Sequence, residues 1–300
     1  MGTGALYLLT VLIWGTTWLA VKWQLNAVAP ELSVFYRFAL AFLVLLVFCK
    51  IQSKRFSFTL KQHFVLFLLG ICVFSVHVLL FYKASFYLVS GCVSVLFSFV
   101  SVFNLINAVL FLNRRPTSFM LVGSGLGILG LVTFFWQDVL SLSFTDSALV
   151  GILEGLVGSY LFSLGNMLSR SFQQQKIDLI SSSTVAVGYG TIVLLCYCLY
   201  SGVDFAFPSS ISYWGLLIYL GVFVSAVGFV SFLNLVSRLG PELAGYATVL
   251  FPVIALSLSS LFEDYRFSWF HYLGASCVIG GNILMVGKKK QVYSSSYISK

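Results

Sequence analysis

Glu154 is the only carboxylate that lies well inside one of the long apolar runs of this sequence. A carboxylate in hydrocarbon is costly, so an intramembrane acid is expected to face the interior of a helix bundle, where it exchanges protons or contacts a cation. Proton transfer is therefore the functional hypothesis for Glu154. A structural ion pair with Arg37, which lies at a similar depth in another run, is the alternative, and the sequence leaves both open.

Three cations, Lys22, Arg37 and Lys83, lie toward the same side of the membrane in their apolar runs. Taken singly, each is expected to reach the lipid headgroups or to end a helix, because long basic side chains extend their charge to the membrane surface. Taken together, they would form a cluster for a carboxylate or phosphate of a substrate.

Polar residues also lie inside the third and fourth runs. His77 is interpreted as a hydrogen-bonded residue of the bundle, with a proton relay as the alternative. The fourth run carries small polar residues at steps of three and four, which places them on one helical face. Such a face must meet another helix or a wet cavity, and we expect a cavity. These residues are Ser90, Ser94, Ser98, Ser101, Asn104 and Asn107.

The sequence contains few of the motifs that are typical of catalytic or metal sites. There is no HExxH motif and no CxxC pair, and Ser276 lies five residues from His271 on a predicted helix. The six cysteines fall in or beside apolar runs, which is typical of small hydrophobic residues. We therefore expect no enzyme activity, no metal and no cofactor. The aspartates outside the runs or at their ends are Asp138, Asp146, Asp178, Asp204 and Asp264.

Membrane helices must position these residues. The chain has 300 residues, of which 59% are hydrophobic and 9% charged, with a mean hydropathy of +1.00. Soluble domains carry about 25% charged residues, and a helix crosses the membrane in about 20 apolar residues. The sequence predicts an all-α integral membrane protein with ten transmembrane helices, no soluble domain and no nucleic-acid partner. The predicted spans are 4–23, 32–50, 63–86, 88–112, 119–137, 148–169, 179–200, 212–236, 242–262 and 269–287.

The basic residues indicate the orientation. With ten spans and both termini in the cytoplasm, thirteen of the seventeen Lys and Arg residues fall on the inner side. The net charge of +8 is therefore mostly an orientation signal. The join between the third and fourth runs, at 86–88, is the least certain, because merging these runs would leave nine spans and lose the charge regularity.

The chain also repeats itself. The segment from Ser101 to Gly130 aligns with the segment from Pro252 to Gly281, so that Gly123 meets Gly274 and Gly130 meets Gly281. Five spans in each half put the second copy upside down, an arrangement found in secondary transporters. We expect a first repeat over residues 1–140, an inverted repeat over 148–287 and a basic, polar cytoplasmic tail over 288–300.

Several motifs resemble the EamA-type domain of the drug/metabolite transporter superfamily. They are Leu12-Ile-Trp14-Gly15-Thr-Thr-Trp18, Phe35-Tyr-Arg37-Phe-Ala39-Leu-Ala41, Phe111-Leu-Asn113-Arg114-Arg115-Pro116, the glycines at 123, 127 and 130, and Leu250-Phe-Pro252-Val-Ile-Ala255. The resemblance covers almost the whole chain.

The resemblance implies a secondary transporter, monomeric or homodimeric, in the lipid bilayer of a bacterial inner membrane. It would move a small polar metabolite by alternating access, with efflux of an amino acid or related metabolite, proton-coupled or by exchange, as the first hypothesis. Uptake of a nucleotide-like or methyl-donor metabolite is the alternative, and a channel is less favoured. By analogy with the family, the substrate cavity would be lined by Trp14, Trp18, His77, Ser98, Ser101, Glu154, Phe162, Gly228, Asn234, Tyr246 and Pro252.

Overall fold

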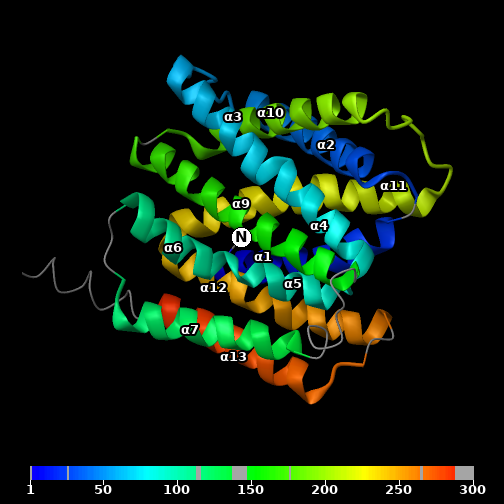
Figure 1. The fold of residues 1–300 in the computed structure, drawn as a ribbon. Coiled ribbons are helices and arrows are strands. Elements are labelled where there is room, and N and C mark those ends of the chain that lie inside the picture. The colour runs from blue at the N-terminus through cyan, green and yellow to red at the C-terminus, as the bar shows by residue number, and fades with distance from the viewer. Residues whose placement is uncertain are drawn as a thin grey trace, which may run out of the picture.

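The computed structural model describes residues 2–25, 27–112, 116–136, 147–175, 177–263 and 266–287, and their side chains except those of residues 112, 170, 171, 173, 174, 233, 236–249 and 285–287. All regular secondary structure in these ranges is helical (Figure 1). The elements are α1 (Thr3–Gln24), α2 (Pro30–Ile51), α3 (Leu60–Phe74), α4 (Val76–Tyr87), α5 (Ser90–Ser98), α6 (Val100–Leu112), α7 (Ser118–Phe134), α9 (Ser147–Gln174), α10 (Leu179–Tyr200), α11 (Ile211–Ile218), the π-helix η1 (Tyr219–Gly228), α12 (Phe229–Phe262) and α13 (Trp269–Gly287).

The prediction of an all-α membrane protein is confirmed. Seven helical segments are long and apolar enough to cross a membrane, and Ser118–Phe134 and Leu250–Phe262 are shorter apolar helices. Together with α13, these segments coincide with the ten predicted runs. Large apolar side chains face outward on several helices, as expected of a surface covered by lipid tails rather than water. Examples are Leu43, Leu110, Leu129, Leu153 and Ile192.

Local signals in the sequence explain several helix ends. Pro30 occupies the first turn of α2, where its missing N–H costs nothing. Thr59 and Gln62 form a capping box at the start of α3. Leu88 and Val89 adopt extended backbone between α4 and α5, so the third and fourth runs are separate helices.

Two of the long apolar segments are interrupted near their middle. Ser75 separates α3 from α4 with φ −144° and ψ −81°, and its hydroxyl donates to the carbonyls of Gly70 and Ile71. Phe99 separates α5 from α6. Broken helices of this kind are tolerated in membranes where neighbouring protein or a cavity satisfies the freed backbone groups.

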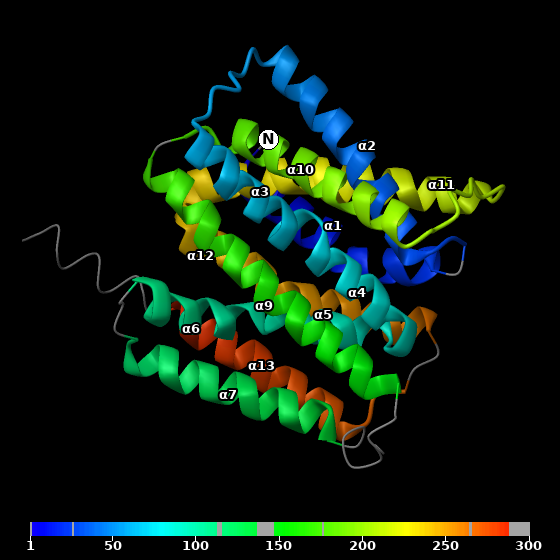
Figure 2. The same cartoon turned by 45° about the horizontal axis from the view of Figure 1, so that its top comes forward.

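Helix α12 extends through Pro241, where the sequence predicts a turn between two spans. A straight α-helix would separate residues 232 and 251 by about 28 Å. Yet the rings of Phe232 and Phe251 both contact Trp14, at centroid distances of 5.1 and 5.5 Å. The chain therefore folds back within α12, and Figures 1 and 2 show its yellow start and its orange end running in opposite directions. The two predicted spans are thus recovered, although helical structure continues through their join.

Small residues bring α7 and α13 close together, and the two helices lie side by side in both views (Figures 1 and 2). A Cβ on Gly130 would lie 2.7 Å from the backbone oxygen of Gly274, and one on Gly281 would overlap the backbone oxygen of Gly123. The contacts thus join residue 130 to 274 and residue 123 to 281, which is a crossed pattern. Crossed pairing is what a two-fold axis produces between equivalent helices.

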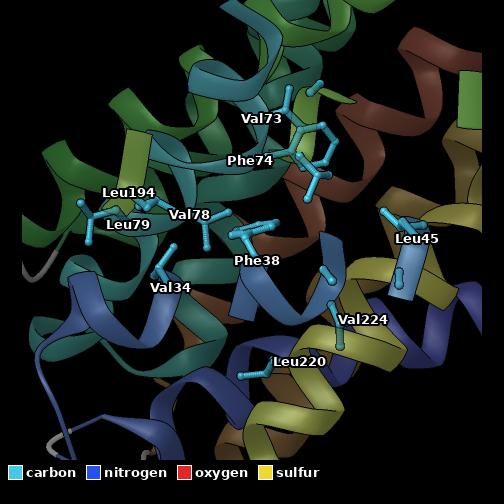
Figure 3. Close-up of a cluster of buried hydrophobic side chains, with 14 of the residues drawn as sticks. Val34, Phe38, Leu45, Val73, Phe74, Val78, Leu79, Leu194, Leu220 and Val224 are labelled. Atoms are coloured by element: carbon cyan, nitrogen blue, oxygen red, sulfur yellow. The ribbon is translucent and has the colours of Figure 1, made fainter. Parts of the chain in front are cut away.

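Two buried apolar clusters make up the interior. One is built mainly by α2, α3, α4, α10 and η1 (Figure 3), and the other mainly by α1, α5, α7, α9, α12 and α13. Helices α1, α4 and α9 contribute buried residues to both clusters. Trp14 and Phe162 pack against both clusters. The region between the clusters is therefore lined by residues from both halves of the chain.

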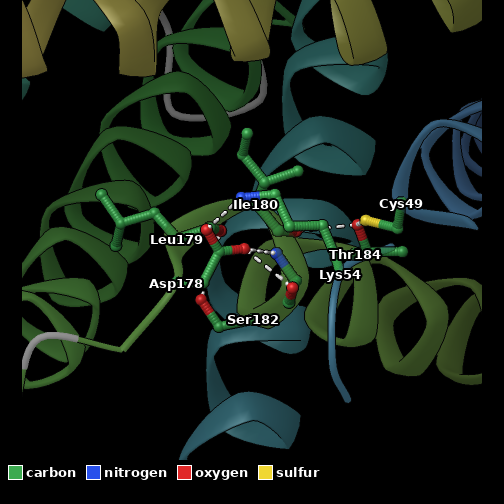
Figure 4. A network of polar contacts seen from close by, with 8 residues as sticks. Cys49, Lys54, Asp178, Leu179, Ile180, Ser182 and Thr184 are labelled. Carbon is green, nitrogen blue, oxygen red and sulfur yellow. Dashed lines mark hydrogen bonds and ion pairs between the residues drawn. The ribbon is translucent and has the colours of Figure 1, made fainter. Parts of the chain in front are cut away.

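The bundle has two ends, which we name by their loops. The near end carries the start of α1 and the connections around residues 51–60 and 174–179. Lys54 pairs there with Asp178 at 2.7 Å (Figure 4), and Gln62 donates to Gln175. The far end carries the connections around residues 24–30, 87–90, 200–211 and 263–269.

Candidate functional site

A cavity of about 210 Å³ lies between the two apolar clusters. Ten phenylalanine and tryptophan side chains contribute to its wall: Trp14, Trp18, Phe38, Phe74, Phe81, Phe97, Phe162, Phe229, Phe232 and Phe251. Its polar lining consists of Thr17, Arg37, His77, Tyr82, Asn166, Ser169, Ser183 and Ser225. Arg37 is the only lysine, arginine, aspartate or glutamate among the described lining residues.

The aromatic wall is one connected set of rings. Trp18 packs against Phe81 and Phe97 with centroids 5.2 and 5.3 Å away, in tilted or edge-on arrangements. Phe162 continues the set by contacting Phe97 at 5.1 Å and His77 at 5.2 Å. Such mutual contacts fix the side-chain rotamers, so the wall is rigid before any ligand enters.

Arg37 is buried, with 6% of its surface exposed, and it projects from α2 into the cavity lining. Its Nε donates to the Ser225 hydroxyl at 2.9 Å, and its guanidinium also interacts with the Tyr82 hydroxyl. The two salt bridges among the described side chains are Lys54 with Asp178 and Lys83 with Glu31, and neither includes Arg37. Arg37 therefore contacts neutral hydroxyls and no described carboxylate.

Two polar atoms of the cavity wall have no hydrogen-bond partner within the described part of the chain. They are the indole Nε1 of Trp18 and the ring Nδ1 of His77. Both side chains are buried, with 8% and 7% of their surfaces exposed. Buried polar atoms are nearly always satisfied in folded proteins, so these two residues of the cavity wall each carry unused hydrogen-bonding capacity.

The π-helix η1 shapes one side of the cavity. Trp14 donates from its indole Nε1 to the Val224 carbonyl at 3.3 Å. Gly228 allows this approach, because a Cβ there would lie 2.7 Å from the same indole nitrogen. Ser225, the partner of Arg37, belongs to the same π-helix. Single π-helical turns are often found at functional sites, where they turn side chains away from the regular helical register.

The structure brings five of the sequence-predicted residues into the cavity lining, namely Trp14, Trp18, Arg37, His77 and Phe162. Ser98, Ser101, Glu154, Gly228, Asn234 and Pro252 are not lining residues, although Gly228 contacts Trp14 and Pro252 follows the lining residue Phe251. Asn234 donates to the Val230 carbonyl of its own helix. The side chain of Tyr246 lies outside the described part.

The polar face of the fourth run meets α9. Asn104 accepts from Ser163 at 2.9 Å and from Asn166 at 3.3 Å, and Asn107 donates to Ser163 at 2.8 Å. Ser98 donates to a carbonyl of its own helix. The expectation of a cavity along this face is therefore not met by these residues, which serve helix packing. Phe97 carries the fourth run's contribution to the wall.

Glu154 lies on α9 outside the cavity lining, and its Oε2 is buried without a partner among the described residues. The cation that acts on it electrostatically is Lys83, which itself pairs with Glu31 at 3.2 Å. Arg37 forms no ion pair with Glu154 in the described part. The acid and the arginine thus belong to separate polar sites.

Five residues hold the junction of α4 and α5 at the far end: Lys22, Ser85, Leu88, Ser90 and Glu263. Lys22 donates to the backbone carbonyls of Ser85 and Leu88, the latter at 3.0 Å. Glu263 accepts from the Ser90 backbone N–H at 3.0 and 3.1 Å and from its hydroxyl. A cation at a helix carboxyl end and an anion at an amino end both complement the helix dipole. We call this set the far-end clamp.

Several lining residues were not identified from the sequence. Ser225 is one small residue in an apolar run, and the contact of its hydroxyl with Arg37 depends on the π-helix. Phe81 and Phe97 belong to a sequence with 30 phenylalanines, in which composition gives no ranking. The step of four from Trp14 to Trp18, and from His77 to Phe81, was the usable signal, because such residues share a helical face.

Comparison with known proteins places the chain among transporters. A model of the EamA-like transporter family matches residues 2–136 and again residues 149–287. The uncharacterized transporter YetK of Bacillus subtilis is 27% identical, with 92% of this chain and 84% of YetK covered. Protein PagO of Salmonella typhimurium is 25% identical over 88% of this chain and 84% of PagO. A solved crystal structure shares the fold, with a TM-score of 0.66 and 15% identity over 94% of this chain and 96% of that one.

Proposed function

The chain belongs to the EamA-like transporter family, and from this premise we propose that it moves a small polar organic metabolite across a bacterial inner membrane by alternating access. The central cavity carries the proposal. It combines a buried arginine and two unpartnered polar atoms with an aromatic wall, which is the composition of a small-molecule site rather than of a packed interior.

The two ends of the bundle support alternating access. At the near end, Asn166 and Ser169 of α9 and Leu179 and Ser183 of α10 belong to the cavity lining, so the cavity extends toward that end. At the far end, the clamp joins α1, α12 and the α4–α5 junction. An arrangement open toward one end and tied at the other is expected of one state in a rocking cycle.

The internal repeat supports the same mechanism. The family model matches the chain twice, and the crossed glycine contacts of α7 and α13 are those of a two-fold axis between equivalent helices. We infer two inverted five-helix halves, over 1–140 and 148–287, followed by a cytoplasmic tail over 288–300. Two inverted halves have equivalent alternative arrangements, which exchange the open and closed ends.

The near end is inferred to face the cytoplasm, because most basic residues fall on that side of the sequence-derived topology. Both termini would then be cytoplasmic, and the cavity would be loaded from inside. Efflux of an amino acid or related metabolite, driven by exchange or by a proton gradient, is the direction that we propose. Lipid and the small-molecule substrate are the expected partners, and a monomer or homodimer is the expected assembly.

Counterflow in proteoliposomes tests the proposal. Purified protein is reconstituted and loaded with a mixed panel of amino acids, organic acids, nucleotides, sugars and polyamines, and exchange is followed by mass spectrometry. Saturable exchange of one chemical class is expected, and nucleotide exchange would instead favour the uptake alternative.

The matched control is Leu129→Ala, a substitution on the exposed apolar surface of α7, which should leave exchange unchanged. Ion leakage without exchange of any panel member would contradict a carrier and indicate a channel.

A further inference from the structure

We propose that the cavity binds an organic monoanion: one carboxylate, held by Arg37, on a single aromatic ring or an apolar body of that size, with no ammonium group. This inference rests on the proposed transport function and names its substrate class. The proposed function names amino acids and related metabolites without distinguishing them. The present inference favours aryl and 2-oxo acids over the zwitterionic amino acids.

Arg37 is the first argument. A buried charge is costly unless it is paired and hydrogen-bonded. The Nε of Arg37 donates to the Ser225 hydroxyl, and the guanidinium interacts with Tyr82. These hydroxyls position the guanidinium but do not neutralise its positive charge. A guanidinium presents paired N–H donors that match the two oxygens of a carboxylate, which makes this anion the natural partner.

The described carboxylates lie outside the cavity lining, and Asp204 is exposed in the loop between α10 and α11. Glu31 and Asp178 pair with lysines, Glu263 belongs to the far-end clamp, and Glu154 lies under the influence of Lys83. None of these groups is a lining residue of the cavity. The charge that neutralises Arg37 is therefore expected from the ligand rather than from this part of the chain.

The aromatic wall is the second argument, and the cavity's size sets a limit. An engineered protein cavity of about 150 Å³ accommodates benzene. The present cavity, at about 210 Å³, has room for one such ring and a small headgroup. Trp18, Phe81, Phe97 and Phe162 offer edges and faces to a ring, as aromatic pairs prefer. A nucleotide, with a base, a sugar and a phosphate, is a poor match for this size.

The two unpartnered atoms are the third argument. The Trp18 indole can only donate a hydrogen bond, so its Nε1 requires an acceptor. The charge of Arg37 acts on His77, which places the two side chains in one electrostatic neighbourhood. A ligand that carries an oxygen acceptor next to its carboxylate, such as a 2-oxo acid, could accept from the Trp18 indole while Arg37 holds the carboxylate.

The discrimination against amino acids follows from the missing counter-charge. An α-ammonium group carries three donors and a full positive charge, and it would enter a cavity whose only formal charge among the described lining residues is also positive. Like charges in a medium of low polarity repel strongly. A 2-oxo acid with the same ring avoids this cost because its second group is a neutral acceptor.

Binding and exchange of four compounds with one shared ring test the proposal. The probes are phenylpyruvate and phenylacetate as anions, phenylalanine as the zwitterion and phenethylamine as the cation. Binding is measured by isothermal titration calorimetry on detergent-purified full-length protein, and exchange by counterflow. The expected order of affinity is anions first, phenylalanine about 10-fold or more weaker, and the cation last. Equal or tighter binding of phenylalanine would overturn the proposal.

Three variants assign the binding energy. Arg37→Gln is expected to weaken phenylpyruvate binding by about 30-fold or more, as for loss of one partner of a buried charge pair, while Arg37→Lys retains part of it. Trp18→Phe keeps a ring and removes the indole N–H, so it is expected to lower phenylpyruvate affinity more than phenylacetate affinity. Anion binding that is unchanged in Arg37→Gln would overturn the assignment of the carboxylate.

The two readouts separate this inference from the transport function. Anions that bind through Arg37 but do not exchange would leave the binding inference intact and contradict transport of these compounds. Exchange of phenylalanine in preference to the anions would support transport and overturn the inference. Circular dichroism and size-exclusion profiles identify folded variants, and Trp18→Phe provides the test if Arg37→Gln does not fold.

Discussion

The three cations that the sequence grouped together have three different roles. Lys22 ends α4 by donating to its last carbonyls, Lys83 pairs with Glu31, and Arg37 reaches the cavity. The expectation that each would extend to the lipid headgroups rested on side-chain length and membrane depth alone. What distinguishes them is the partner that the fold provides, and a partner on a distant helix is invisible in the sequence.

Asp178 provides a residue-scale prediction outside the membrane segments (Figure 4). Burial alone would raise the pKa of its carboxyl, but hydrogen bonds from Lys54 and from the N–H and hydroxyl of Ser181 outweigh burial and hold the pKa below its usual value. A lowered pKa in the folded state means that the stabilisation is complete above the unfolded pKa of about 3.9 and is lost as the pH falls through the folded value.

We therefore expect Asp178→Ala to lower the free energy of unfolding by about 1 kcal/mol at pH 7, because the amino-terminal cap of α10 is lost. Asp178→Asn keeps a capping oxygen and loses only a half-exposed ion pair, worth about 0.5 kcal/mol. Denaturation in detergent at pH 7 and below pH 4 measures both. A difference between wild type and Asp178→Asn that does not shrink as the pH falls below the unfolded pKa of about 3.9 would contradict the assignment.

Glu154 carries a second prediction at this scale. If the buried acid is the proton carrier, Glu154→Gln should abolish the dependence of transport on a pH gradient while exchange at equal pH continues, because glutamine cannot titrate. Proteoliposome flux with and without a gradient measures this. Glu31→Gln, which removes the partner of Lys83, is the matched control. If transport by Glu154→Gln depended on the pH gradient as in wild type, the proton hypothesis would be wrong.

At the scale of elements, irregular helices place the cavity. The interruption at Ser75 lies two residues before His77, and the π-helix carries Val224 and Ser225. The fold-back within α12 brings Phe232 and Phe251 to the same indole of Trp14. Regular helices of the same length would place these side chains on other faces, so the wall depends on the departures from regular geometry.

The α7–α13 contact yields an element-scale prediction. Gly130→Ala places a Cβ 2.7 Å from backbone atoms of α13, which must move apart, so we expect a loss of about 1–3 kcal/mol of stability. Gly125→Ala is the matched control on the same helix, because a Cβ there meets nothing within 4 Å. Thermal unfolding in detergent compares the two. Equal melting temperatures would contradict close packing at Gly130.

At the scale of the whole molecule, the far-end clamp joins helices that lie far apart in the chain. Lys22 and Glu263 come from α1 and the end of α12, and both hold the junction of α4 and α5. The clamp thus joins segments from both proposed halves. A transporter that alternates between two arrangements must break such contacts to expose its cavity at the far end.

We predict that Glu263→Ala favours opening at the far end, because the amino terminus of α5 loses its anionic cap. A cysteine at Val21, a lining residue near that end, reports access to a membrane-impermeant maleimide in a background without the native cysteines. Labelling from the far side should rise in Glu263→Ala. Asp204→Ala, an acid in a far-end loop outside the clamp, should leave labelling unchanged, and an unaltered rate in Glu263→Ala would contradict the gating role.

The sequence by itself determined the membrane-helical class, the position of the ten apolar segments and the family. Apolar run length and composition are enough for the class and the segments, because hydrocarbon forces every backbone polar group into helical hydrogen bonds. The family followed from the resemblance of sequence motifs. Trp14 and Trp18, which are four residues apart and so share a helical face, both line the cavity. These are local properties, which a chain carries whatever surrounds it.

Only the tertiary structure decided which polar residues share a site. The stripe from Ser90 to Asn107 has the spacing of a cavity wall, yet Asn104 and Asn107 form hydrogen bonds with Ser163 of α9. Arg37 has the position of a headgroup-seeking cation, yet Ser225 of a distant π-helix positions it in the interior. Periodicity states which side chains share a helical face. What that face meets depends on contacts between residues far apart in the chain, and the sequence alone does not specify them.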